Sequence, residues 1–188
     1  MAQSPLTALS PLDGRYQRKV GALSDYFSEF GLIRHRVIVE VRWLQSLAAQ
    51  PAIEEVPNLS DAASRRLERL ITEFDESDAQ RVKHIERTTN HDVKAVEYFL
   101  KEKIAGNAAL EKVGEFIHFA CTSEDINNLA YGLMLLDART RCLLPVMDEL
   151  IESIRALAHR HASMPMMSHT HGQPASPTTL GKEMAVFA

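Results

Sequence analysis

Two histidines, His169 and His171, lie one residue apart in a polar segment, and imidazole is the side chain best suited to proton transfer near neutral pH. Hydroxyl and amide side chains surround them between residues 168 and 179. Gly172, Pro174 and Pro177 disfavour a regular helix, so the pattern predicts a shaped loop between helices. The segment is a candidate proton-transfer site. The alternative is a polar surface turn that happens to contain histidines.

A second candidate, the sequence Thr89-Asn90-His91-Asp92, spans the end of one predicted helix and the start of the next. Thr and Asn favour helix caps, because their side chains satisfy free backbone groups. We expect His91 in the first turn of the following helix, where the helix dipole favours a bound anion. The alternative is a capping cluster with one exposed histidine.

Two further junctions contain groups that suit an anionic substrate. Thr122 and Asp125 have the spacing of a capping box, which predicts a helix start with Ser123 beside it. Arg15 and Tyr16 follow a predicted turn at residues 13–14, and a guanidinium on a turn can hold a carboxylate or phosphate. Most such arginines are simply solvated.

The histidines also form two His-x-His pairs, at 159 and 161 and at 169 and 171, which raises the possibility of a metal site. No carboxylate or thiol lies among them, so we expect no metal. The chain contains no glycine-rich phosphate loop and no Gly-x-Ser-x-Gly motif. The residue types therefore favour a non-covalent acid–base reaction on an anionic small molecule, without a cofactor.

The composition is that of an ordinary globular protein, with 45% hydrophobic and 24% charged residues among 188. A net charge of −4 and a pI near 6.1 give no support for a nucleic acid or an anionic membrane as partner. No apolar run is long enough to span a bilayer, and the N-terminus lacks the features of a signal peptide. Cys121 and Cys142 lie in apolar surroundings and are interpreted as buried free thiols. We expect a soluble, cytoplasmic protein.

Hydrophobic spacing predicts helices throughout. We expect a helical region over 22–49 with a break near Gly31, a helix over 60–74 capped by Ser60, a helix that begins at Ser77, and one over 93–104. The clearest pattern is a heptad seam within a predicted helix over 123–159. Its positions are Ile126, Leu129, Leu133, Leu136, Thr140, Leu143, Met147, Leu150, Ile154 and Leu157.

This seam continues in phase past Pro145, so we expect the proline to bend the helix locally without ending it. A second partial stripe, which includes Ala130 and Met134, predicts more than one packing partner. The preceding short helices are too small to cover both stripes. The pattern therefore predicts a large bundle completed by further sequence, by other subunits, or by both.

Four blocks of the sequence resemble the adenylosuccinate lyase family of the fumarase/aspartase superfamily, most closely its bacterial branch. They are residues 10–16 (SPLDGRY), 86–92 (ERTTNHD), 116–128 and 170–175 (THGQPA). The Thr-Ser-x-Asp and Thr-His-x-Gln elements within them are shared across the superfamily. The blocks at 13–16 and 89–92 distinguish this family from argininosuccinate lyase and fumarase.

The resemblance implies β-elimination of fumarate from adenylosuccinate, giving AMP, and from the succinyl-carboxamide ribotide of purine biosynthesis (SAICAR to AICAR). It implies that His171 is the general acid and that Thr170 contacts the succinyl group. It further implies that His91 orients and polarises the substrate. The implied contacts to the substrate, including its phosphate or dicarboxylate, are Arg15, Tyr16, Asn90, Asp92, His118, Thr122 and Ser123.

In this family the catalytic base is a serine on a mobile loop further along the chain, and long helices from several subunits form a homotetramer. We therefore expect an all-α chain with an N-terminal helical domain over 1–111 and a truncated first part of the bundle domain over 112–188. We expect this chain alone to be inactive. The alternatives are another fumarate-releasing lyase, such as argininosuccinate lyase, and a non-catalytic helical assembly module.

Overall fold

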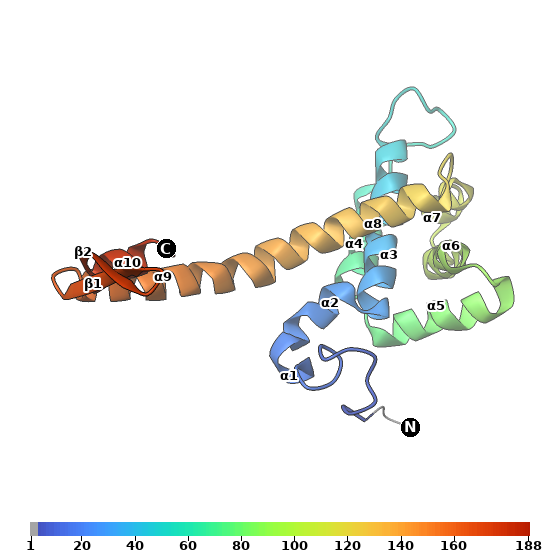
Figure 1. Cartoon of the computed structure of the whole chain (residues 1–188). Helices are drawn as coiled ribbons and strands as arrows, with labels where there is room; N and C mark the ends of the chain where they lie inside the picture. The colour runs from blue at the N-terminus through green and yellow to red at the C-terminus, as the bar shows by residue number, and fades with distance from the viewer. Residues whose placement is uncertain (1–3) are drawn as a thin grey trace. The chain divides into compact units, whose positions relative to one another are not determined.

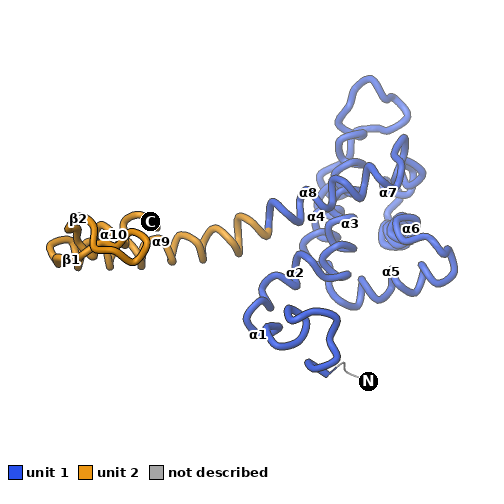
Figure 2. Tube along the Cα trace, in the orientation of Figure 1, with its two compact units in different colours: residues 1–137 blue, residues 138–188 orange. Residues whose placement is uncertain are grey.

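The computed structural model describes residues 4–188 and divides into two compact units, Met1–Asp137 and Ala138–Ala188 (Figure 2). The division at 137 concerns compactness alone, and the predicted domain boundary between residues 111 and 112 stays a prediction.

The first unit is helical (Figure 1). Its longest helix, α3, packs against α4, α5 and α6 around a core that includes Val37, Leu44, Leu67 and Phe99. The helices are α1 (Gln17–Val20), α2 (Ser24–Phe27), α3 (Glu29–Ala48), α4 (Asp61–Thr72), α5 (Glu76–Thr89), α6 (Asp92–Ile104), α7 (Ala108–Glu111) and α8 (Ser123–Ala138), with 3-10 turns at Gly21–Leu23 and Gly114–Phe116.

Several helix starts follow side-chain caps, and some of these caps match the sequence predictions. Ser60 accepts from the Ala63 N–H and begins α4, as predicted. The predicted break near Gly31 lies at Ser28, which caps α3. The predicted start at Ser77 is wrong: Asp75 caps α5, because its carboxylate accepts from the Asp78 N–H.

Helix α8 buries one of its stripes and exposes another. Ile126 and Ala130 pack with Val39 of α3 and Val93 of α6 in a small second core. Ile126 is the first position of the predicted heptad seam, but the next position, Leu129, is 60% exposed. Further along the same seam, Leu143, Met147, Leu150 and Leu157 of the second unit are also exposed. The described chain therefore covers its seam at Ile126 and leaves most of the later seam positions exposed, and the predicted further packing partners stay a prediction.

The second unit contains a π-helical segment (Arg139–Leu143), α9 (Leu144–Arg160), β1 (Pro165–Thr170), β2 (Gln173–Thr179) and α10 (Leu180–Ala185). The π segment ends two residues before Pro145, and the Leu144 N–H bonds to the Arg139 carbonyl five residues back. The wider turn accommodates a residue that has no N–H and whose ring crowds the preceding turn. The helix continues beyond Pro145, as predicted.

The loop predicted for residues 168–179 is wrong, because strands β1 and β2 form an antiparallel hairpin there. His171 and Gly172 both have positive φ, at 50° and 78°, and they connect Thr170 to its partner Gln173. Two successive residues of this kind make the tight turn that suits a twisted hairpin. Glycine and proline excluded a helix correctly, but they did not exclude strands.

The helix predicted from Leu180 is present as α10. Its Gly181 approaches α9 so closely that an added Cβ would lie 2.4 Å from the Ala158 carbonyl oxygen. With the exception of the hairpin, the described fold is the predicted all-α one. None of the described helices is long and apolar enough to cross a membrane.

Candidate functional site

His91 is the N-cap of α6, one position before the first turn in which it was predicted. Its Nδ1 accepts from the Lys94 N–H at 3.1 Å. A neutral imidazole that accepts at Nδ1 carries its proton on Nε2. This nitrogen lies 3.4 Å from the Ser123 hydroxyl at the start of α8. The backbone of α6 thus sets the tautomer of His91 and directs Nε2–H toward Ser123.

The neighbouring Asp92 is held by Arg36, a residue of α3 that is only 4% exposed. The Arg36 guanidinium donates to the Asp92 carboxylate at 2.6 Å and to the Asn127 side-chain oxygen at 2.9 Å. Burial disfavours ionisation of Asp92, but the Val93 N–H and Arg36 outweigh it and hold the pKa of Asp92 below its ordinary value. Asp92 is therefore a fixed carboxylate beside the His91 ring.

Asn90 contributes backbone geometry to the same junction. It ends α5 in the left-handed conformation, with φ 50°, and its N–H bonds to the Glu86 carbonyl. Asn tolerates this conformation better than most residues. The sharp turn places His91 at the start of α6 directly after the end of α5.

A second polar pair joins His118 to Glu40 of α3. The His118 Nδ1 lies 2.6 Å from a Glu40 carboxylate oxygen, and Glu40 is fully buried. Burial raises the pKa of Glu40 above its ordinary value, while the His118 ring acts in the opposite direction. Both Arg36 and Glu40 come from α3, so this helix holds Asp92, the neighbour of His91, and the ring of His118.

The start of α8 shows the predicted capping geometry. The Asp125 carboxylate accepts from the Thr122 N–H at 2.7 Å, which is one half of a capping box. This bond fixes the segment that presents Ser123 to His91. The structure therefore brings together His91, Asp92 and Ser123 from two separate sequence blocks.

Arg15 and Tyr16 lie beside α1. The Arg15 guanidinium carbon is 5.3 Å from the centre of the Tyr16 ring, a cation–π contact. Tyr16 is 39% exposed. The described contacts of His91, Asp92 and Ser123, called the His91 cluster below, include neither Arg15 nor Tyr16. The predicted role of this pair in binding an anion stays a prediction.

Thr170 and His171 belong to the second unit, where His171 occupies the hairpin turn and is exposed. His169, in contrast, is a strand residue that pairs with Pro174. The hairpin therefore distinguishes the two histidines: His171 is presented at a tip, and His169 lies within the ladder.

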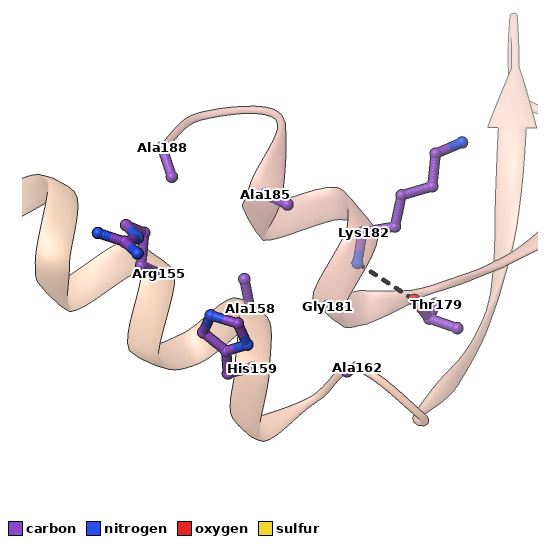
Figure 3. Close-up of a pocket in the computed structure, with 9 residues that line it drawn as sticks. All are labelled: Arg155, Ala158, His159, Ala162, Thr179, Gly181, Lys182, Ala185 and Ala188. Atoms are coloured by element: carbon purple, nitrogen blue, oxygen red, sulfur yellow. Dashed lines mark hydrogen bonds between the residues drawn. The ribbon is translucent and has the colours of Figure 1, made fainter.

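A pocket of about 550 Å³ also occurs in the second unit, between α9 and α10 (Figure 3). Its polar lining includes Arg155, His159 and Lys182, and the Thr179 hydroxyl accepts from the Lys182 N–H at 3.1 Å. Its lining contains neither Thr170 nor His171. Within residues 4–188, no group of three or more His, Cys, Asp or Glu side chains is arranged to hold a metal ion.

Sequence reasoning missed Arg36, Glu40 and Asn127. Arg36 and Glu40 are four residues apart and share a face of α3 beside its apolar stripe. A charged pair at this spacing is usually a solvated surface pair, and both residues are buried here. Only the packing of α8 and the segment before it on α3 distinguishes the two cases.

The chain matches a family model described as "Lyase" over residues 14–188. It is 61% identical over 185 residues to an adenylosuccinate lyase of Haemophilus influenzae, an alignment that covers 98% of this chain and 41% of that protein. It is 59% identical over 188 residues to the adenylosuccinate lyase of Escherichia coli K12, with 100% and 41% covered. The chain thus spans about two-fifths of the length of these curated relatives.

Among solved structures, a fumarate lyase from Mesorhizobium sp. BNC1 matches with a TM-score of 0.62 at 24% identity, covering 89% of this chain and 36% of that one. At that identity the likeness supports the fold alone. The match to the family model includes the His91 cluster and the His171 hairpin, and it extends over most of the chain. The chain therefore belongs to the lyase family.

Proposed function

We propose that this chain is part of an adenylosuccinate lyase, a carbon–nitrogen lyase of purine nucleotide biosynthesis. The reaction is β-elimination of fumarate from adenylosuccinate, giving AMP, and from SAICAR, giving AICAR. The observation that carries the proposal is identity of 58–61% to curated adenylosuccinate lyases over essentially the whole chain. The whole protein acts in the cytoplasm, as a homotetramer, without a cofactor.

In the proposed reaction His171 protonates the departing nitrogen, and its exposed position at a hairpin tip supports that role. Thr170, beside it, contacts the succinyl group. His91 polarises the substrate through Nε2–H, the proton that its contact with Lys94 leaves available. Arg15 and Ser123 supply donors for anionic groups.

His118 and Thr122 bind a carboxylate or phosphate of the substrate in the same proposal. Tyr16, which stacks on Arg15, and Asn90 and Asp92, which flank His91, complete the substrate contacts. The fixed charge on Asp92 favours a positively polarised His91 ring during the reaction.

A chimera tests the proposal directly. The segment of the E. coli K12 enzyme that aligns with this entire chain is replaced by this chain. Fumarate release is measured with adenylosuccinate and, separately, with argininosuccinate. The proposal expects turnover of adenylosuccinate alone. Turnover of argininosuccinate would support the alternative lyase, and a folded, assembled but inactive chimera would support a helical assembly module.

The role of His171 is tested in the same chimera. His171→Ala is expected to lower kcat by ~10²–10⁴, the usual contribution of a general acid. The matched control is His169→Ala, which removes an imidazole from the strand ladder of the same hairpin and should change kcat less than tenfold. A loss below tenfold in His171→Ala would exclude the acid role.

A further inference from the structure

Helix α3 holds the segment before α8 in an uncommon conformation. His118 and Ala120 both have positive φ, at 64° and 58°, a region that residues other than glycine seldom adopt. Two α3 side chains three residues apart hold the segment. Glu40 bonds to the His118 ring, and the Trp43 Nε1–H donates to the Phe119 carbonyl at 2.8 Å. The surrounding structure thus imposes the conformation that His118 adopts.

Burial of Glu40 at this position is unfavourable in free energy. Its side chain is 0% exposed, one oxygen bonds to His118, and the other has no hydrogen-bond partner within residues 4–188. A buried carboxylate with an unsatisfied oxygen costs free energy, and an apolar residue of similar size would pack there at lower cost. Glu97 of α6 provides a contrast, because it is also buried, at 5% exposed, but pairs with both Lys94 and Lys101. Packing alone therefore does not account for Glu40.

The geometry of the pair gives Glu40 a definite effect on the imidazole. An ionised carboxylate only accepts hydrogen bonds, so the His118 Nδ1 must carry a proton at 2.6 Å from it. The ring is then fixed in orientation, and Nε2 is the nitrogen left for another group. The His118 side chain is 20% exposed, which leaves an approach to the ring.

We propose that Glu40 is a positioning residue that orients His118 and keeps Nδ1 protonated, so that Nε2, once it also carries a proton, donates to an anionic group of the substrate. The identity of that anion rests on the proposed lyase function, whereas the effect of Glu40 on the ring does not. The negative charge behind Nδ1 also stabilises a doubly protonated ring when an anion binds at Nε2.

The test is nuclear magnetic resonance of this chain labelled with ¹⁵N-histidine, in which two-bond couplings report which ring nitrogen carries the proton. His118→Gln identifies the His118 signals by their loss. In alkaline buffer, where free imidazole favours the Nε2–H form, we expect His118 in the Nδ1–H form. An Nε2–H form in the unmodified chain would overturn the proposal.

Glu40→Met keeps an unbranched buried side chain and should shift His118 to the Nε2–H form. Glu97→Met is the matched control, and it should leave His118 in the Nδ1–H form. Persistence of the Nδ1–H form in Glu40→Met, or its loss in the control, contradicts a specific role for Glu40. If Glu40→Met fails to fold, the unmodified chain alone decides. Failure of the lyase proposal would appear as a chimera that releases no fumarate from adenylosuccinate, and it would leave these couplings unchanged.

Discussion

Replacement of Arg36 by Met should destabilise the first unit more than the loss of an ordinary surface ion pair. Arg36 is 4% exposed and donates one hydrogen bond to the Asp92 carboxylate and another to Asn127. A hydrogen bond to a charged group contributes about 1.5–3 kcal/mol. Asp92 is 46% exposed, so water would solvate its carboxylate after the change. We therefore expect a loss of about 1–3 kcal/mol in the free energy of unfolding.

The loss should depend on pH in a defined direction. The pKa of Asp92 is lowered in the fold from its ordinary 3.8, so its contribution to stability is present above that pH. The contribution is lost as pH falls through the lowered pKa of the folded state. Arg36→Met removes one cause of the lowered pKa of Asp92. The difference in the free energy of unfolding between this variant and the unmodified chain should therefore become smaller in acid.

The assay is urea unfolding followed by fluorescence of Trp43, the one tryptophan of the chain, which lies on α3 in the first unit. The matched control is Arg81→Met, which removes an arginine that also makes two bonds to another helix, to Glu102, but with both partners nearly half exposed. We expect a smaller effect in the control. Equal effects of the two variants, or a loss from Arg36→Met that is constant from neutral pH to acid, would refute the reasoning.

Three further outcomes follow from the packing. Gly181→Ala should destabilise the second unit by ~1–3 kcal/mol in thermal unfolding, since its Cβ would overlap backbone atoms, whereas Gly132→Ala, with open space around it, should raise stability by up to ~1 kcal/mol. Asp75→Ala should lower Tm more than Ser77→Ala, because the Asp75 carboxylate caps α5; the reverse order would restore Ser77 as the cap. Leu150→Glu should change the stability of the isolated chain by less than ~0.5 kcal/mol. In the chimera the same change should reduce the mass of the oligomer measured by sedimentation, because Leu150 is an exposed seam residue. An unchanged mass would show that the seam makes no contact between subunits.

Local patterns predicted most helices of this fold and the types of group at its site. Ser60 and the pair Thr122 and Asp125 mark helix starts by short-range hydrogen bonds, which depend on residues within one turn. The heptad seam predicted both a long helical region and its uncovered apolar face, because helical periodicity is a local property. The hairpin was missed because glycine and proline exclude a helix without choosing between a loop and strands.

The sequence by itself determined the helix periods, the caps at Ser60 and Thr122, and the histidines that can move protons, since each depends on residue type and short spacing. Only the tertiary structure decided that Arg36 and Glu40 are buried, and that they hold Asp92 and His118. Both are ordinary charged residues of a helix until α8 and the segment before it pack over α3. Burial then removes the water that would otherwise screen them, and the same charges become fixed partners of the site.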